Sequence, residues 1–408
     1  MGSVAAASAL DRRRRADALE DTLRARVWRA RARVSRAEGV MVFDAPGVGA
    51  WTVRLHGGRA TLERGRALRA TSTLRADADT LLAVLEGRER GADAFLAGRL
   101  VVRGSLALPM ELDDLLPPAR RDARAIRVRR VTADGLSTFC LEAGREDAPA
   151  VVLFHGLGAT SASFLPTICD LSADHRVIAP DLPGFGETAK PLTPLRPEFF
   201  ARHAVHLLDE LRVPRAHLVG NSMGGRIALE VALRSPERVG RVALLCPSLA
   251  WKRFRFAARL VRLLRHEMAV VPMPMPHAGV TLSLRFLFAD ARRVPSAGML
   301  AAADEFRRVF SSVRGRVALF NAMREIYLEE PHGEQGFWER LPKLAPPSLF
   351  VFGDKDMLVP PSFARFVSEA LPAARISLFD DCGHVPQFEW PDRTHALIRS
   401  FFAEHERG

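Results

Sequence analysis

The sequence predicts an α/β fold, a mostly parallel eight-stranded sheet with helices on both faces, preceded by a small α+β domain. Three observations support this prediction. Short apolar runs alternate with helical stretches over residues 126–247, the alternation resumes over residues 349–379, and a differently patterned N-terminal part ends at a Pro-Pro pair, residues 117–118. Continuous apolar runs are typical of strands buried on both faces, and their alternation with helices produces a parallel sheet.

The N-terminal part is predicted to be one domain, residues 1–118, that begins with a helix. Within residues 11–39 five apolar residues are spaced for one face of an amphipathic helix: Leu19, Leu23, Val27, Trp28 and Val34. Glycine and proline residues then separate short strand-like runs. The expected order after the first helix is strands within 40–75, helices at 77–85 and 93–96, a strand at 99–104 and a helix at 105–116.

The C-terminal part is predicted to be a second domain, residues 131–408, reached through a basic linker at residues 119–130. An insertion at about residues 248–345 interrupts the strand–helix alternation, and its sequence favours a helical cap. The expected strands are 150–154, 177–179, 217–219, 242–245, 349–352 and 376–379, and the expected helices include 199–211 and 222–234.

The net charge of +12 first suggests nucleic acid or an anionic membrane surface as a partner. However, only four of the 59 basic residues are lysine, a ratio that indicates biased codon usage rather than a selected binding face. Aromatic residues make up only 7% of the chain, which leaves few side chains for stacking on bases. We therefore expect no nucleic-acid partner.

The four cysteines are scattered and form no CxxC pair, which argues against a metal site and against a disulfide framework. No cofactor is expected either. The N-terminal residues lack the order of a secretory signal, in which basic residues precede a long apolar stretch. Because no apolar run is about 20 residues long, we expect no membrane span and a cytoplasmic location.

The most informative motif is G-x-S-x-G, formed by Gly220, Ser222 and Gly224 between an expected strand and an expected helix. A serine at such a sharp turn is pushed clear of the sheet, and the free N–H groups of the helix start face developing negative charge. Ser222 is therefore the predicted nucleophile. A dinucleotide-binding loop also lies between strand and helix, but its G-x-G-x-x-G spacing is absent.

A serine nucleophile needs a base that a third group holds in place. His384 follows the last expected strand, at the carboxyl edge where active sites of open α/β sheets gather. The acid is expected after the preceding strand, where Asp354 and Asp356 both lie. The strand at 242–245 is followed by no carboxylate, which removes the other place for an acid.

The oxyanion of an acyl-transfer intermediate needs two backbone donors. Met223, directly after the nucleophile, is expected to supply one. Leu157, in the loop after an early strand, is expected to supply the other. His155 lies in the same loop, and we expect it to shape the loop rather than to transfer protons.

Five segments carry a resemblance to one superfamily: HG-x-G at 155–158, DLPGFG at 181–186, GNSMGG at 220–225, GDKD-x-x-VP at 353–360 and GH-x-P at 383–386. This combination resembles the α/β-hydrolase superfamily over about residues 126–408. The resemblance favours Asp356 as the acid through a G-x-x-D-x-x-V-P arrangement, with Asp354 as the alternative. It implies an esterase, lipase, thioesterase, amidase or carbon–carbon-bond hydrolase in which the insertion is the cap.

The N-terminal domain resembles the sterol-carrier-protein family of lipid-binding domains over about residues 17–118. The segments that carry this resemblance are 51–55, 76–82 and 94–108. It implies a small α+β domain with an apolar tunnel for an acyl chain or a sterol. The alternative is a domain that keeps this fold and serves only for packing or dimerisation.

These observations predict a serine hydrolase that cleaves carboxylic esters through an acyl-enzyme. Within residues 251–265 arginines alternate with apolar residues, which favours either a surface for anionic lipid or a helix packed on the core. Residues 271–276 are expected to line the pocket. Together with the lipid-carrier-like domain, this cap favours lipid or medium-to-long acyl esters and peripheral membrane contact. The alternatives are a carbon–carbon-bond or small-ester hydrolase with an incidental N-terminal domain, and a non-catalytic lipid-transfer protein.

Overall fold

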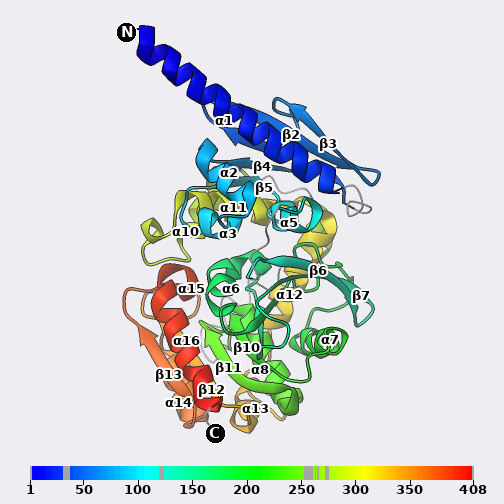
Figure 1. The fold of residues 1–408 in the computed structure, drawn as a ribbon. Coiled ribbons are helices and arrows are strands. Elements are labelled where there is room, and N and C mark those ends of the chain that lie inside the picture. Colours follow the sequence, from blue (N-terminus) through cyan, green and yellow to red (C-terminus); the bar gives the residue numbers. More distant parts are fainter. Residues whose placement is uncertain are drawn as a thin grey trace. The chain divides into compact units, whose positions relative to one another are not determined.

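The computed structural model describes residues 2–30, 37–118, 124–251, 261, 263, 266–271 and 275–406 (Figure 1). The chain forms two compact units. The first comprises residues 1–128 together with 295–305, and the second comprises residues 129–294 and 306–408. No helix in the described part of the chain is both long enough and apolar enough to cross a membrane.

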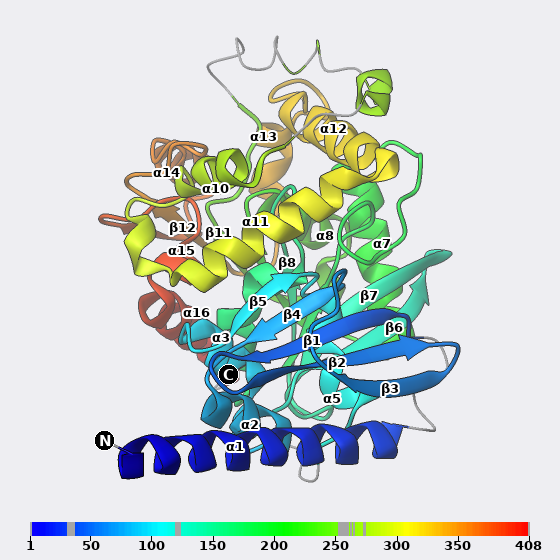
Figure 2. The ribbon, with the colours of Figure 1, turned by 90° about the horizontal axis from the view of Figure 1, so that it is seen from above.

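The first unit is built on a five-stranded sheet with the order β3-β2-β1-β4-β5. Only the pair β1–β4 is parallel, and the other neighbours are antiparallel. The strands are β1 (Gly39–Ala45), β2 (Gly49–His56), β3 (Arg59–Arg64), β4 (Ser72–Arg75) and β5 (Val101–Gly104). Figure 2 shows the first helix, α1 (Gly2–Arg29), extended alongside this sheet.

Short helices complete the first unit. Helix α2 (Ala78–Glu86) begins after Asp77, whose carboxylate accepts a hydrogen bond from the N–H of Thr80, and ends at Gly87 with a φ of 75°. The helix expected at 105–116 is in fact two short helices that meet at Glu111. The remaining helices are α3 (Gly91–Leu96), α4 (Ala107–Met110) and α5 (Leu112–Leu115).

Helix α1 is amphipathic as expected, but the prediction that Trp28 lies on its apolar face is wrong. Leu19 and Leu23 are fully buried and Val27 is half-buried, whereas Trp28 is 66% exposed; Val34 lies outside the described residues. Because a helical face repeats every three to four residues, the next inward position after Leu23 is residue 26. Arg26 lies there, fully buried, and donates hydrogen bonds to Asp113 Oδ1 at 2.6 Å and to the carbonyl of Leu85 at 2.8 Å.

The second unit is built on an eight-stranded sheet with the order β13-β12-β11-β10-β8-β9-β7-β6. Strands β8 to β13 pair in parallel, and β7 joins β9 in antiparallel orientation. This confirms the mostly parallel sheet expected from the apolar runs. The strands are β6 (Arg127–Ala133), β7 (Leu136–Ala143), β8 (Ala150–Phe154), β9 (Arg176–Pro180), β10 (Ala216–Asn221), β11 (Val239–Leu245), β12 (Ser348–Gly353) and β13 (Arg375–Phe379).

Helices cover both faces of this sheet (Figure 1). Helix α7 packs against α8, and α16 packs against α6. Because β8 and β10 to β12 are buried along almost their whole length, they need this double cover. The helices are α6 (Leu165–Leu171), α7 (Pro197–Glu210), α8 (Met223–Arg234), α14 (Phe363–Ala370), α15 (Pro386–Glu389) and α16 (Pro391–Glu406).

The insertion between β11 and β12 is mainly helical where it is described. Its helices are α10 (His277–Arg285), α11 (Ser296–Ser311), α12 (Val313–Tyr327) and α13 (Phe337–Arg340), with short 3-10 turns η4 (His266–Val270) and η5 (Ala291–Arg293). Most of the arginine-rich segment at 251–265, and residues 272–274 of the predicted pocket lining, lie outside the described residues. The predicted membrane contact of the cap therefore stays a prediction.

One part of the insertion belongs to the first unit, a division that the local sequence pattern does not predict. Within that unit, Asp304 accepts hydrogen bonds from the N–H of Gly104 at 2.9 Å and from Arg103 Nε at 2.8 Å. The buried Glu305 accepts one from the N–H of Leu106 at 2.7 Å. Two adjacent carboxylates thus hold this stretch of α11 at the end of β5.

Candidate active site

Ser222 lies at the turn between β10 and α8 and has an unusual backbone, with φ 56° and ψ −118°. Such a conformation costs a non-glycine residue about 1–3 kcal/mol and persists only where the surroundings impose it. Here the Ser222 N–H donates to the carbonyl of Leu245 at 3.0 Å, and the Ser222 carbonyl accepts from the N–H of Ser248 at 2.9 Å. Leu245 is the last residue of β11 and Ser248 lies just beyond it, so the neighbouring strand and the residues after it hold the turn in place.

The glycines around Ser222 are required for steric reasons. A methyl group on Gly224 would overlap the carbonyl oxygen of Phe154, and one on Gly220 would overlap the carbonyl oxygen of Gly224. At Gly225 the added carbon would lie 2.8 Å from Pro247 Cβ. The G-x-S-x-G-G pattern is therefore what allows α8 to start directly behind β8.

The structure brings His384 and Asp356 together. His384 Nδ1 lies 2.8 Å from Asp356 Oδ2, and both side chains are buried. The other carboxylate oxygen of Asp356 accepts hydrogen bonds from the N–H groups of Leu358 at 2.8 Å and Val359 at 2.9 Å. A carboxylate held by these bonds can orient the imidazole so that its other nitrogen is free to act as a base.

Asp354, the alternative acid, has different contacts. Its Oδ1 accepts a hydrogen bond from the N–H of Cys382 at 3.2 Å, and its Oδ2 lies 3.7 Å from Lys355 Nζ. It therefore supports the loop before His384, while Asp356 contacts the imidazole.

The predicted oxyanion loop lies against Ser222. A Cβ atom built on Gly156 would lie 3.4 Å from Ser222 Cβ, which places Leu157 in the next position along. Gly158 follows with a φ of 75°, and a side chain there would collide with Phe306 and contact Leu319 of the cap. Met223, the second expected donor, starts α8 directly after Ser222.

His155 shapes this loop through both ring nitrogens. Nε2 accepts a hydrogen bond from the N–H of Leu182 at 2.9 Å, so the ring proton resides on Nδ1, which donates to the carbonyl of Gly156 at 2.8 Å. Burial lowers the pKa of His155 to about 4, although the bond to Gly156 opposes this shift. His155 is thus a neutral structural side chain at ordinary pH.

Asn221 also supports the site, a role that was not predicted from the sequence. Its Nδ2 donates to the carbonyl of Leu245 and to the carbonyl of His384, both at 3.0 Å. The residue before the nucleophile therefore holds the backbone of the histidine. Its place within the G-N-S motif is the only signal that could have identified it.

Cys246 lies at the end of β11, where the sequence offered no carboxylate. Ligand-type atoms of Cys246, Asp356 and His384 lie within 4.8 Å of one another. Burial raises the pKa of the Cys246 thiol well above its usual range, and the nearby Asp356 raises it further. A thiol held in its protonated form is a poor metal ligand, and it contacts the carbonyl of Gly383 at 3.6 Å.

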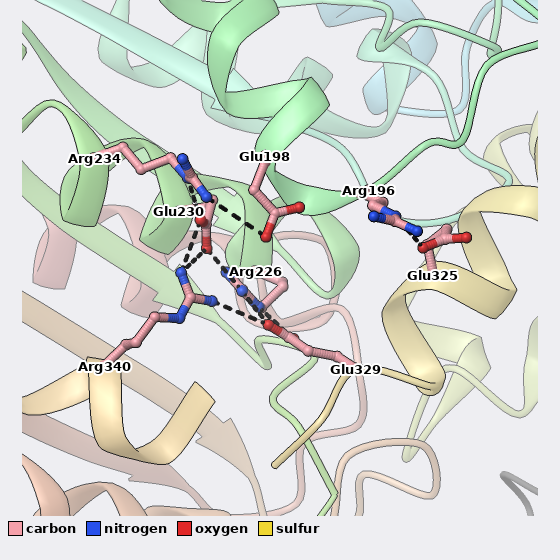
Figure 3. A network of polar contacts seen from close by, with 8 residues as sticks. All are labelled: Arg196, Glu198, Arg226, Glu230, Arg234, Glu325, Glu329 and Arg340. Atoms are coloured by element: carbon pink, nitrogen blue, oxygen red, sulfur yellow. Dashed lines mark hydrogen bonds and ion pairs between the residues drawn. The ribbon is translucent and has the colours of Figure 1, made fainter. Parts of the chain in front are cut away.

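Helix α8, which starts directly after Ser222, carries a buried charge network (Figure 3). Arg226, fully buried, donates from Nε to Glu329 at 2.7 Å and from a terminal nitrogen to Glu230 at 2.8 Å. Glu230 also accepts from Arg340 at 2.9 Å and from Arg234 at 2.5 Å. Because Glu329 follows α12 and Arg340 ends α13, these ion pairs tie α8 to the cap.

Family comparisons agree with this geometry. Residues 149–391 match the family model for the alpha/beta hydrolase fold, which covers more than half of the chain. The chain belongs to the alpha/beta hydrolase family. Residues 20–117 match the SCP-2 sterol transfer family, as the N-terminal resemblance implied.

Individual relatives of this hydrolase carry several activities. A 2-hydroxy-6-oxononadienedioate/2-hydroxy-6-oxononatrienedioate hydrolase from Pseudomonas sp is 28% identical over 279 residues, covering 64% of this chain and 90% of the relative. An acetyltransferase component of the acetoin cleaving system of Pseudomonas putida is 29% identical over 267 residues, which are 65% of this chain and 66% of that protein. A bacterial membrane phospholipase A structure is 26% identical with a TM-score of 0.59, covering 69% and 87% of the two chains.

Proposed function

We propose that the second unit is a serine hydrolase that cleaves carboxylic esters through an acyl-enzyme. The observation that carries this proposal is the 2.8 Å contact between His384 Nδ1 and Asp356 Oδ2, in a loop whose His384 carbonyl accepts a hydrogen bond from Asn221, the residue before Ser222 in the strained turn. In the proposed cycle, His384 Nε2 takes the hydroxyl proton of Ser222 while the serine oxygen attacks the acyl carbonyl. Asp356 orients the imidazole and stabilises its charged form.

The remaining steps follow from the same groups. The N–H groups of Met223 and Leu157 stabilise the oxyanion, each contributing about 3 kcal/mol to lowering the barrier. The intermediate collapses, and the leaving alkoxide takes the proton from His384. Water then attacks the acyl-enzyme, giving its proton to His384, and the acid leaves as the serine regains its proton.

The proposed substrates are lipid esters or other esters with a medium or long acyl chain. Three observations support this choice. Phe306 and Leu319 of the cap lie against the loop beside Ser222, giving it apolar surroundings. The chain is similar to a membrane phospholipase A, and it carries an SCP-2 unit.

We also propose that the first unit binds an acyl chain or a sterol. A cavity in this unit has mainly apolar walls, with Leu74, Val84, Phe95, Leu100 and Val102 among the residues that line it. The cavity is small, with a volume of about 70 Å³. Titration of the full-length protein with a fluorescent fatty acid tests this. Val102→Trp should abolish binding and leave ester hydrolysis intact, and equal binding by the variant contradicts the proposal.

A second candidate is hydrolysis of a carbon–carbon bond or of small esters, with the first unit uninvolved in catalysis. The similarity to the Pseudomonas dienedioate hydrolase favours it. A series of p-nitrophenyl esters separates the two candidates, because a lipid-ester hydrolase should prefer octanoyl over acetyl, and the opposite preference would reject the lipid assignment. Ser222→Ala tests the catalytic proposal itself, since unchanged hydrolysis by this variant would leave a non-catalytic lipid-transfer protein.

A further inference from the structure

Glu389 is a buried carboxylate that the proposed mechanism does not use. It ends α15, five residues after His384, and only 3% of the residue is exposed. Its Oε2 accepts a hydrogen bond from the N–H of Gly383 at 2.7 Å. Its Oε1 accepts from the N–H of Asp290 at 2.7 Å and from Arg293 at 3.3 Å.

These partners come from two distant stretches of the second unit. Gly383 immediately precedes His384, whereas Asp290 and Arg293 belong to residues 287–293 of the cap, named here the clamp segment. A buried carboxylate is costly unless donors compensate for its lost hydration, and here both oxygens have them. Glu389 therefore stabilises the two stretches only when they lie together.

Further contacts join the clamp segment to the histidine loop. The N–H of His384 donates to the carbonyl of Leu287 at 2.7 Å, and a side chain on Gly383 would overlap that same carbonyl. Arg293 donates to the carbonyl of Asp381 at 2.6 Å, and its guanidinium lies 4.2 Å from the centre of the Trp390 ring. The backbone of His384 is thus bonded on one side by the cap.

We propose that Glu389 is a positioning residue that fastens the clamp segment to the histidine loop and so fixes the imidazole of His384 relative to Ser222 and Asp356. This inference rests on the proposed serine-hydrolase function. In this proposal the cap and the sheet together position His384. Loosening the clamp should slow the chemistry, because small displacements of a catalytic group from its reactive geometry cost up to about 100-fold in rate.

The matched test compares Glu389→Gln with Glu142→Gln. Glu142 is also buried and forms ion pairs with Arg176 at 2.7 Å and Arg129 at 2.9 Å, but it lies on β7, outside the loops that carry Ser222, Asp356 and His384. Each change removes one buried negative charge without altering the side-chain shape. Urea unfolding measures the free energy of unfolding of both variants. If Glu389 served only stability, the two variants should lose similar amounts of this free energy and should not differ in catalysis.

The first readout is the labelling rate of Ser222 by a fluorophosphonate, in which the serine oxygen forms a bond to phosphorus, fluoride leaves and His384 takes the proton. We expect Glu389→Gln to lower this rate and kcat about 10- to 100-fold with little change in KM. The far-downfield proton NMR signal of the His384–Asp356 hydrogen bond should shift or broaden. Glu142→Gln should leave the labelling rate and the signal unchanged.

The outcomes separate this inference from the proposed function. If the wild-type protein is not labelled at Ser222, the serine-hydrolase proposal falls. If the wild type is labelled and Glu389→Gln reacts at the same rate with the same NMR signal, the positioning role is overturned. If Glu389→Gln does not fold, Arg293→Met replaces it in the test. This change removes only the side-chain donor of Glu389 and leaves its two backbone donors, the N–H groups of Asp290 and Gly383, in place. Slower labelling supports the clamp, and an unchanged rate overturns it.

Discussion

Close packing around glycines and backbone hydrogen bonds hold both the turn at Ser222 and the loop at His384, but the two regions depend on them to different degrees. The turn at Ser222 is fixed by contacts that leave no space for side chains at Gly220 and Gly224, within two residues of the serine. The loop at His384 is fixed mainly by hydrogen bonds: Asn221 donates to the carbonyl of His384, the N–H of His384 donates to the carbonyl of Leu287, and the N–H of Gly383 donates to Glu389. A steric constraint cannot be relaxed without moving the backbone, whereas a lost hydrogen bond allows a small displacement. Substitutions at the turn should therefore affect folding, and substitutions at the loop should affect rate.

The largest effect is expected for Gly224→Ala, because its methyl group would overlap the backbone oxygen of Phe154 in β8. We expect a loss of about 4 kcal/mol or more in the free energy of unfolding, or failure to fold. Gly279→Ala is the control, since Gly279 lies in α10 with only an ordinary contact to Pro276, and alanine favours helices. Urea unfolding measures both variants. Equal stabilities would contradict the steric account of the turn.

Asn221→Ala should slow catalysis through the loop. The change removes the hydrogen bonds from Nδ2 to the carbonyls of Leu245 and His384. We expect kcat to fall by roughly 10-fold or more, with a stability loss of about 1–3 kcal/mol because two buried acceptors lose a donor.

Asn321→Ala provides the matched control for Asn221→Ala. Asn321 also bridges two backbone groups, accepting from the N–H of Leu195 at 3.1 Å and donating to the carbonyl of Thr193 at 2.9 Å. The Asn321→Ala variant should lose stability but keep the wild-type kcat. Similar kcat values for the two variants would show that the loop needs no anchor at Asn221.

The contrast between turn and loop also explains what could be predicted from the sequence. The turn was predictable because the glycines that its packing requires lie within three residues of Ser222 in the chain. Their spacing is enough to place Ser222 at the turn. The choice of Asp356 over Asp354 needed the resemblance, since both carboxylates follow the same strand. The structure separates them because the N–H groups of Leu358 and Val359 turn Asp356 toward His384.

The clamp could not be predicted, because Asp290 and Glu389 are 99 residues apart in the chain and no local motif marks them. Trp28 illustrates a related difficulty. An apolar residue at nearly the right spacing faces solvent, while the charged Arg26 takes the inward position by bonding to Asp113. A one-dimensional pattern shows which residues prefer burial, but not which buried charge will find a partner.

A smaller effect is expected for the charge network behind the turn. Burial alone would raise the pKa of Glu230, but Arg226, Arg340 and Arg234 outweigh it and lower the pKa to about 2. A lowered folded-state pKa stabilises the protein above the unfolded value of about 4.5, and this contribution is lost as the pH falls toward 2. Urea unfolding between pH 5 and 3 should therefore show a steeper decline for the wild type than for Glu230→Gln. Parallel declines would contradict the assigned pKa direction.

The smallest effect concerns the two histidines beside Ser222. His384 is expected to gain and lose a proton in each cycle, whereas His155 should keep one neutral tautomer, because burial lowers its pKa to about 4 and the N–H of Leu182 occupies Nε2. Nitrogen NMR of labelled imidazoles should show the proton of His155 on Nδ1 at every pH above about 4. The acid limb of the activity profile then belongs to another group. If the nitrogen signals of His155 instead showed protonation near pH 6.5, the ordinary pKa of histidine, the loop would be open to water and less constrained than the turn that it faces.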